Sequence, residues 1–210
     1  MSYFILVRHG TSEWNAKGLW TGWTDVNLNH QGREQARQAG ESIKDIKIDK
    51  AYTSDLKRAQ QTLEEILKVI KVNNLPTVIT PAIKERNYGD LSGKNKWKIK
   101  EQYGEEQFMK WRRSWDIRVP NGESLKDVYA RVIPYYKKHL LPELKSGKNI
   151  LVAAHGNSLR ALVKYLDHIS DKDISKLEFG LGEVYFYTID GQGKVVAKEI
   201  QSVNPMKGKI

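Results

Sequence analysis

The chain has 210 residues, enough for one sizeable hydrophobic core, and we expect a single domain over residues 1–210. It contains no cysteine, so disulfides, thiolate metal sites and a cysteine nucleophile are excluded. Its formal net charge of +10 would suit a nucleic-acid or membrane partner, but the basic residues are spread among 25 acidic ones except at 94–100 and 207–209, so we expect neither.

The first predicted element is the apolar run at residues 4–7, which is short, rich in branched side chains and typical of a buried strand. It ends at the triplet Arg8-His9-Gly10. The run is too short for a signal-sequence core or a membrane span, and no basic leader precedes it, so we expect a cytoplasmic protein. Periodicity then predicts, in chain order, a helix at about 32–43, a strand at 50–53, a helix at 59–70 and a strand at 77–80.

The second half of the chain begins with an amphipathic helix, predicted over 125–140, which opens with Ser124 and Asp127 at capping-box spacing. The run at 150–154 predicts another buried strand, and this strand also ends at a histidine, His155. The remaining predicted elements are a helix at about 158–167 and strands at 184–189 and 195–199, joined by a turn at 190–193. This alternation predicts an α/β fold, a three-layer sandwich with a mixed, mostly parallel sheet and helices on both faces.

The two strands that end in a histidine suggest one phosphate pocket. Open α/β sheets bind ligands at the carboxyl ends of parallel strands, where helix starts offer free N–H groups to anions. Phosphoryl transfer needs positioning and fixed positive charge, which Arg8, Arg58 and the pair Arg112-Arg113 would supply. A neutral imidazole can attack phosphorus, and neighbouring arginines favour the neutral form. Glu85, in a non-helical stretch bounded by glycine, is a candidate proton donor.

Each of these residues also has a purely structural interpretation. A lone histidine at a strand end is more often structural than catalytic, and the second His-Gly at another strand end is what favours chemistry. Glu85 alone would be a surface ion-pair partner, and Arg112-Arg113 alone would be a solvated face. We expect no metal at His9 and His155, because no cysteine and no closely spaced histidine or carboxylate completes a tetrahedral set.

Seven segments form recognisable motifs, at 6–15, 21–28, 52–59, 85–89, 94–96, 111–113 and 153–166. The Arg-His-Gly triplet marks only a large superfamily that includes many phosphatases. Glu-Arg-Asn-Tyr-Gly at 85–89, Asn-Lys at 95–96 and Trp-Arg-Arg at 111–113 are more specific. With these segments, the chain resembles the cofactor-dependent phosphoglycerate mutases of the histidine phosphatase superfamily. The resemblance covers nearly the whole chain and is to the short form of these enzymes.

The resemblance implies a role for each matching residue. His9 would be the nucleophile that becomes phosphohistidine, and Glu85 would be the general acid and base. Arg8, Arg58 and His155 would bind the transferred phosphoryl group. The residues implied to hold the phosphoglycerate are Asn15, Thr21, Gly22, Tyr88, Lys96, Arg112, Arg113, Gly156 and Asn157.

The implied reaction interconverts 3-phosphoglycerate and 2-phosphoglycerate in glycolysis and gluconeogenesis, through a phosphohistidine primed by 2,3-bisphosphoglycerate and without a metal. The expected partners are small phosphoglycerates, with neither nucleic acid nor membrane, and the choice between monomer and homo-oligomer stays open. Two alternatives remain. A phosphohydrolase of the same superfamily would leave Lys96 and Arg112-Arg113 without an anion to hold, and a binding protein without activity would have no chemical reason to keep both histidines.

Some stretches differ from the pattern of the family. Only residues 114–122 follow the Trp-Arg-Arg motif before the next predicted helix, where many members carry an insertion. Asn87 stands where histidine is common, and residues 179–184 lack the Thr and Pro usual there. The tail, ending at 204–210, is short. Because a lid that excludes water protects a phosphoenzyme, we expect a curtailed tail to raise phosphatase leakage.

Overall fold

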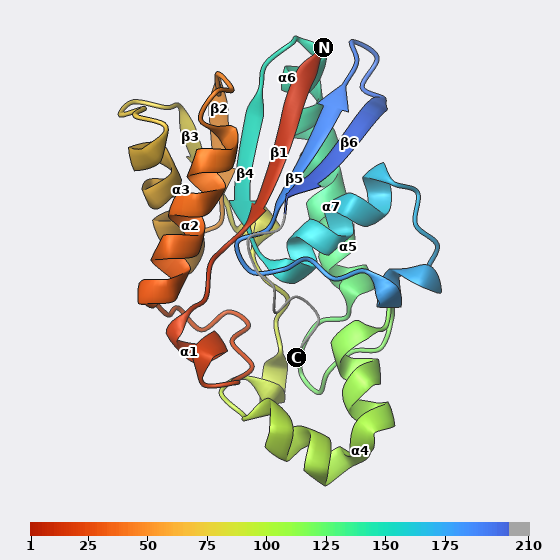
Figure 1. Cartoon of the computed structure of the whole chain (residues 1–210). Helices are drawn as coiled ribbons and strands as arrows, with labels where there is room; N and C mark the ends of the chain where they lie inside the picture. Colours follow the sequence, from red (N-terminus) through yellow and green to blue (C-terminus); the bar gives the residue numbers. More distant parts are fainter. Residues whose placement is uncertain (202–210) are drawn as a thin grey trace.

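The computed structural model describes residues 1–201 and contains a six-stranded sheet in the order β3-β2-β4-β1-β5-β6 (Figure 1). The strands are β1 (Ser2–Arg8), β2 (Lys50–Thr53), β3 (Thr77–Ile79), β4 (Ile150–Ala154), β5 (Val184–Ile189) and β6 (Val195–Gln201). The first four strands of this order are mutually parallel, whereas β5 runs antiparallel to both of its neighbours. The predicted mixed, mostly parallel sheet is therefore confirmed, with its antiparallel hairpin at one edge. The predicted tail beyond residue 201 lies outside the described residues.

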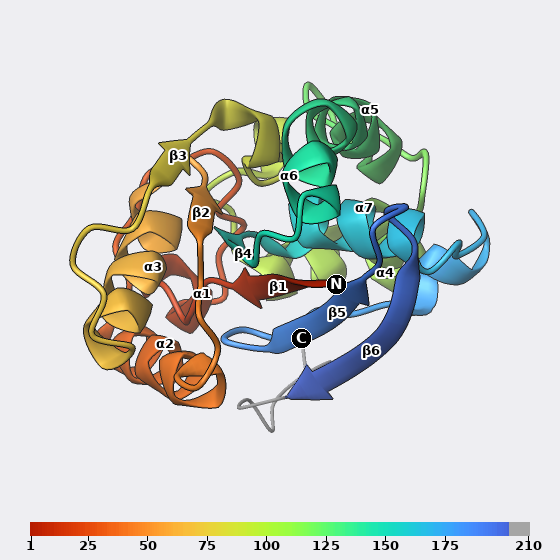
Figure 2. The same cartoon turned by 90° about the horizontal axis from the view of Figure 1, so that it is seen from above.

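Helices cover both faces of this sheet, as Figure 2 shows from above. The α-helices are α1 (Glu13–Ala16), α2 (His30–Ile43), α3 (Lys57–Val69), α4 (Lys96–Arg113), α5 (Leu125–Tyr135), α6 (Leu141–Lys145) and α7 (Gly156–Leu166). Short 3-10 turns lie at Pro81–Ile83, Gly89–Leu91 and Asp173–Lys176. α2 and α3 lie on one face, and α5, α6 and α7 lie on the other (Figure 2). Within residues 1–201 no helix is both long and apolar enough to cross a membrane.

Alternate residues of the central strands supply the two halves of the core. Ile5 and Val7 of β1 pack toward α2 and α3, while Phe4 and Leu6 pack toward α5 and α7. All four side chains are fully buried, because β1 lies between two strands and two helical layers. The unbroken apolar run in the sequence reflects this two-sided burial.

The helix predicted over 125–140 is interrupted. α5 ends at Tyr135, one π-helical turn covers Tyr136–Leu140, and α6 follows. Pro134, near the end of α5, and Pro142, in the first turn of α6, flank this turn, and because neither can donate a backbone hydrogen bond, a regular hydrogen-bond donor is missing on each side of it. The start of α5 agrees with prediction, since Ser124 Oγ accepts from the Asp127 N–H and Asp127 Oδ2 accepts from the Ser124 N–H.

The long helix α4, which projects away from the sheet at the bottom of Figure 1, has no counterpart among the predicted elements. Only three of its side chains are buried, those of Ile99, Phe108 and Trp111, so its apolar periodicity is weak. Gly104 also breaks the helix, with a φ of 79° that only glycine adopts readily. The Trp111 end of α4 returns toward the sheet, and both ends of the helix reach the site described below.

The loop after β1 packs directly on the first turn of α2. A Cβ at Gly10 would lie 2.1 Å from the carbonyl oxygen of Gly32, and a Cβ at Gly32 would lie 2.1 Å from the carbonyl oxygen of Thr11. Neither position has room for a side chain, since the nearest atoms belong to the backbone. This close contact fixes the chain immediately after His9.

We expect the substitution Gly32→Ala to lower the free energy of unfolding by about 3 kcal/mol, because the added methyl group forces two backbone segments apart. Gly191→Ala is the matched control, since a Cβ there meets no atom within 4 Å and the cost should stay within about 0.5 kcal/mol. Urea denaturation measures both values. Equal stability of the two variants would contradict the close contact.

Candidate active site

The register of β1 and β4 brings the two histidines together. The strands are parallel neighbours with Arg8 opposite Ala154, so His9 and His155 leave the sheet side by side. The N–H of His9 donates to the carbonyl of Ala154 at 2.9 Å, and the two imidazole centroids lie 5.1 Å apart. Both rings are buried, and His155 immediately precedes the first turn of α7. We call His9 and His155 the histidine pair.

The contacts of His9 define its tautomer. Its Nδ1 lies 2.7 Å from the carbonyl oxygen of Gly10, and because a carbonyl only accepts, Nδ1 carries the proton and donates. On the other side of the ring, Arg58 Nε donates to Nε2 at 3.3 Å, which requires Nε2 to be unprotonated. The imidazole is therefore neutral, with the lone pair of Nε2 facing Arg58.

The pKa of His9 is lowered well below its usual value, first by burial and then by the positive charges of Arg58 and Arg8. The pKa of His155 is lowered in the same way, with burial again the largest cause and Arg58 the next. The Nε2 of His155 also hydrogen-bonds to Ser54 Oγ at 2.6 Å. Both rings are thus held in the neutral form at physiological pH.

The buried Arg58 and the half-buried Arg8 flank the histidine pair, and carbonyl oxygens hold them in place. Arg58 donates to the carbonyls of Gly22 and Thr24, at 2.8 and 3.0 Å. Arg8 donates through Nη1 to the carbonyl of Phe179. Gly156 allows Arg8 to approach α7, since a Cβ there would lie 3.2 Å from the guanidinium carbon. Burial lowers the pKa of Arg58 to about 10, which still leaves it charged at neutral pH.

Glu85 is held by N–H groups from two directions. Its Oε1 accepts from the backbone N–H of Arg86 at 2.7 Å and from the backbone and side-chain N–H groups of Asn157, at 3.2 and 3.0 Å. The Asn157 side chain also donates to Tyr88 Oη at 2.9 Å, and Arg160 donates to Asn157 Oδ1 at 3.0 Å. This network fixes the Glu85 carboxylate.

Helix α4 supplies positive charge from both of its ends. Lys96 is its first residue, and Arg112 and Arg113 are its last; we call these three residues the outer cation cluster. Burial and the neighbouring Arg112 lower the pKa of Lys96 to about 8. Glu178 lies against the two arginines, with Oε2 2.7 Å from Arg113 Nη2 and Oε1 3.8 Å from Arg112 Nη2.

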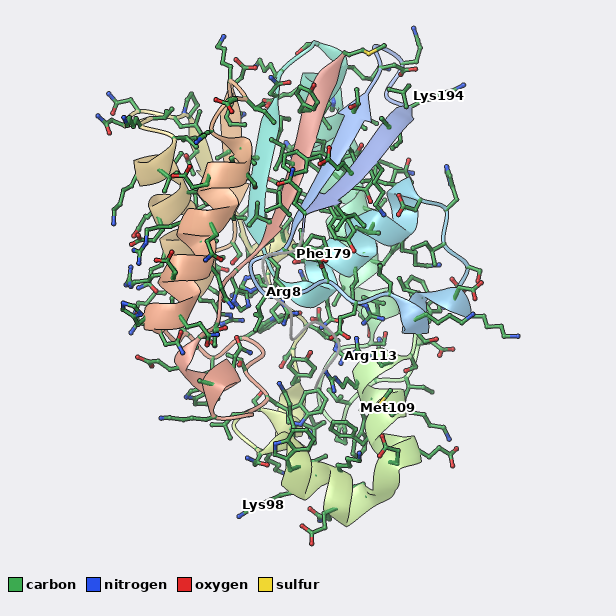
Figure 3. All side chains as sticks on the ribbon, in the orientation of Figure 1. Arg8, Lys98, Met109, Arg113, Phe179 and Lys194 are labelled. Carbon is green, nitrogen blue, oxygen red and sulfur yellow. The ribbon has the colours of Figure 1, made fainter. Side chains whose placement is uncertain are left out.

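Two adjoining cavities connect these groups. The inner cavity is lined by Arg8, His9, Asn15, Leu19, Trp20, Thr21, Gly22, Arg58, Glu85, Tyr88 and Lys96. The outer cavity is lined by Arg8, Trp20, Glu85, Tyr88, Lys96, Arg112, Arg113, Gly156, Asn157, Arg160, Glu178 and Phe179. In Figure 3, Arg8, Phe179 and Arg113 lie in the middle of the molecule, between the sheet and α4. The cavities share Arg8, Trp20, Glu85, Tyr88 and Lys96, so one elongated ligand could contact both.

Every site residue predicted from the sequence lines one of these cavities, except His155, which lies behind His9 against Ser54. The prediction missed Trp20, Arg160 and Glu178. Arg160 stands one helical turn after Asn157, a spacing that could have indicated it. Within residues 1–201, no group of three or more His, Asp or Glu side chains is arranged to hold a metal ion.

The family model of the histidine phosphatase superfamily, branch 1, matches residues 4–201, and the chain belongs to that superfamily. A 2,3-bisphosphoglycerate-dependent phosphoglycerate mutase of Mesorhizobium japonicum is 50% identical to it over 93% of this chain and 96% of the relative. The enzyme of the same name from Parvibaculum lavamentivorans is 48% identical, over 93% of this chain and 94% of the relative. A mycobacterial glucosyl-3-phosphoglycerate phosphatase complexed with VO3 has the same fold, with a TM-score of 0.82, 21% identity and coverage of 97% of this chain and 99% of that chain.

We expect the nitrogen signals of His9 and His155 in ¹⁵N NMR spectra to remain those of neutral imidazole below the usual pKa of about 6.5, where an exposed imidazole is protonated. The unfolded chain takes up these protons near pH 6.5 and the folded chain does not. The free energy of unfolding should therefore fall below that pH, by up to about 1.4 kcal/mol per pH unit for each histidine.

Single His9→Gln and His155→Gln variants assign the signals and should each reduce this pH dependence. The His9 spectrum should also show the tautomer with the proton on Nδ1. Imidazolium signals from either ring at pH 6 would contradict the lowered pKa values.

Proposed function

We propose that this protein is a 2,3-bisphosphoglycerate-dependent phosphoglycerate mutase that interconverts 3-phosphoglycerate and 2-phosphoglycerate. The observation that carries the proposal is the connection of two anion sites, one at the histidine pair and one at the outer cation cluster, with Glu85 lining both cavities. The relatives at about 50% identity, which carry this name, support it over almost the whole chain.

Two anion sites are what distinguish a mutase from a simple phosphatase here. A phosphoglycerate carries a carboxylate in addition to its phosphate, and it must bind with either hydroxyl position near the histidine. Hydrolysis of a phosphate ester needs only the inner cavity, whereas Lys96, Arg112 and Arg113 offer guanidinium and ammonium donors to a second anionic group. The outer cation cluster therefore favours isomerisation.

The residues support a specific sequence of bond changes. Nε2 of His9, which carries no proton, attacks phosphorus and forms an N–P bond while the bond from phosphorus to the glycerate oxygen breaks. Arg8 and Arg58 stabilise the charge on the three phosphoryl oxygens, and a phosphoryl oxygen replaces His9 as the acceptor of the Arg58 Nε proton. His155, whose pKa is lowered by burial and by the charge of Arg58, stays neutral and adds no competing positive charge.

Glu85 completes the proton balance. As the bond to the leaving oxygen breaks, the Glu85 carboxyl donates a proton to that oxygen. In the return step, it accepts the proton of the attacking hydroxyl, whose oxygen forms the new bond to phosphorus while the bond to His9 breaks. Asn157 and the Arg86 N–H hold one carboxyl oxygen in place, so the geometry is the same in both directions.

The donors fit a bisphosphorylated acid. Arg8 and Arg58 face one end of the connected cavities, Lys96 lies between, and Arg112 and Arg113 face the other end, so two phosphates and a carboxylate all find positively charged partners. 2,3-Bisphosphoglycerate, when bound, supplies the phosphoryl group that charges His9. The implied site residues Asn15, Thr21, Gly22 and Tyr88 line the inner cavity and would contact the ligand there.

The same proposal extends to the setting of the enzyme. We infer a single catalytic domain of the short form, in which residues 114–122 connect α4 to α5 without an inserted segment. Its substrates are small phosphoglycerates, not nucleic acids or membranes, and its place is the cytoplasm, where glycolysis and gluconeogenesis use this reaction.

The proposal predicts that the protein converts 3-phosphoglycerate to 2-phosphoglycerate in excess EDTA, that catalytic 2,3-bisphosphoglycerate raises the rate, and that His9→Ala abolishes it. A coupled enolase assay, with the wild-type chain and the variant side by side, measures all three. Release of inorganic phosphate that depends on His9, without isomerisation, would assign the protein to the phosphatases of the superfamily.

We further expect Glu85→Gln to lower kcat for isomerisation by about 10²- to 10⁴-fold, because an amide fills the same space but neither donates nor accepts the proton in transfer. Glu85→Asp, which keeps a carboxyl group at a shorter reach, should recover part of the rate. Steady-state kinetics and a circular dichroism spectrum distinguish lost chemistry from lost folding. A Gln variant within tenfold of the wild-type rate would exclude Glu85 as the proton donor.

A further inference from the structure

Glu178 brings a negative charge into a cavity otherwise built to hold anions. It lies in the segment between the 3-10 turn Asp173–Lys176 and β5, and its side chain is 20% exposed. Its carboxylate contacts Arg113 at 2.7 Å and Arg112 at 3.8 Å. These are the two guanidinium groups at the far end of α4 from Lys96.

The two carboxylates that line the outer cavity have different partners. Glu85 accepts from the N–H groups of Arg86 and Asn157, which carry no net charge there, so its position is fixed by the backbone and by an amide. Within residues 1–201, the ion pairs of the Glu178 carboxylate are with the charged groups of Arg112 and Arg113. Its contact is the one that a carboxylate or phosphate of a ligand would itself make with the same nitrogens.

We propose that Glu178 is a specificity-determining residue, an internal carboxylate that occupies Arg112 and Arg113 until the second anionic group of a ligand replaces it. This inference rests on the proposed function, because it assigns that second group to the phosphoglycerate. A ligand with a phosphate and a second anion displaces Glu178 and gains the two arginines. A ligand with a phosphate alone leaves the ion pairs of Glu178 intact and gains nothing from the outer cation cluster.

The position of Glu178 also connects the two ends of the site. The next residue, Phe179, accepts the hydrogen bond of Arg8 through its carbonyl oxygen, and Arg8 faces the histidine pair. Glu178 is therefore adjacent in sequence to the residue whose carbonyl oxygen holds Arg8.

The test is Glu178→Gln, which keeps the size and hydrogen-bonding ability of the side chain and removes its charge. Calorimetry in a His9→Ala background, where no ligand is turned over, compares 3-phosphoglycerate with glycerol 3-phosphate, which has a neutral hydroxymethyl group in place of the carboxylate. We expect Glu178→Gln to tighten 3-phosphoglycerate binding about tenfold, because a like charge next to the bound carboxylate is removed. The affinity for glycerol 3-phosphate should change by less than about twofold.

Glu106→Gln is the matched control, since Glu106 is an exposed residue of α4 whose loss changes the net charge equally, outside the cavity. Glu106→Gln should change the affinity for 3-phosphoglycerate and the affinity for glycerol 3-phosphate by no more than about twofold each. Glu178→Ala, which removes both the charge and the hydrogen bond from Arg113, should also tighten the binding of 3-phosphoglycerate. Weaker binding in both Glu178 variants would show that Glu178 merely positions the arginines, and an equal change for both ligands would equally overturn the inference.

The outcomes separate this inference from the proposed function. Isomerisation by the wild-type chain, together with no selective tightening in Glu178→Gln, would refute the role of Glu178 and leave the mutase intact. Selective tightening in a chain that does not isomerise phosphoglycerates would refute the mutase and leave Glu178 as the residue that regulates access to Arg112 and Arg113.

Discussion

The parallel pairing of β1 with β4 is the constraint on which the rest of the site depends. Because Arg8 lies opposite Ala154, the residues that follow, His9 and His155, emerge next to each other at one edge of the sheet. A shift of this register by one residue would exchange the side chains of the two core layers, and both layers are fully packed. Burial of the core therefore enforces the register, and the register places the histidine pair.

The inner cavity keeps its positive charge because its arginines are paired with carbonyl oxygens. Arg58 donates to the carbonyls of Gly22 and Thr24, and Arg8 donates to the carbonyl of Phe179, so carbonyl oxygens hold both guanidinium groups without a neutralising carboxylate. Burial and, after it, the charge of these arginines lower the pKa of His9, and the same charge remains available to a phosphoryl group. The outer cation cluster follows a different principle, since Glu178 neutralises part of it in the free protein.

Much of this arrangement could be predicted from the sequence, because it depends on local patterns. Apolar runs that end in His-Gly indicate strand ends, and Ser124 with Asp127 indicates a helix start, so the strands of the sheet and the start of α5 are predicted near their observed positions. Helix α4 was not predicted, because Gly104 interrupts a helix with few buried side chains. Glu178 was missed for another reason: its partners lie 65 residues away, and only the folded chain brings them together.

The two parts of the site differ in how firmly the fold holds them, and this difference decides where ligand specificity can vary. The histidine pair depends on buried strands, whereas Lys96 and Arg113 depend on a helix that is broken at Gly104 and on the segment before β5. The mycobacterial phosphatase shares the fold at 21% identity, so the fold alone does not fix the ligand. Changes in α4 and around Glu178 can alter which second group is recognised without disturbing the sheet. Phosphoryl chemistry is thus a property of the core, and the choice of substrate is a property of the elements that cover it.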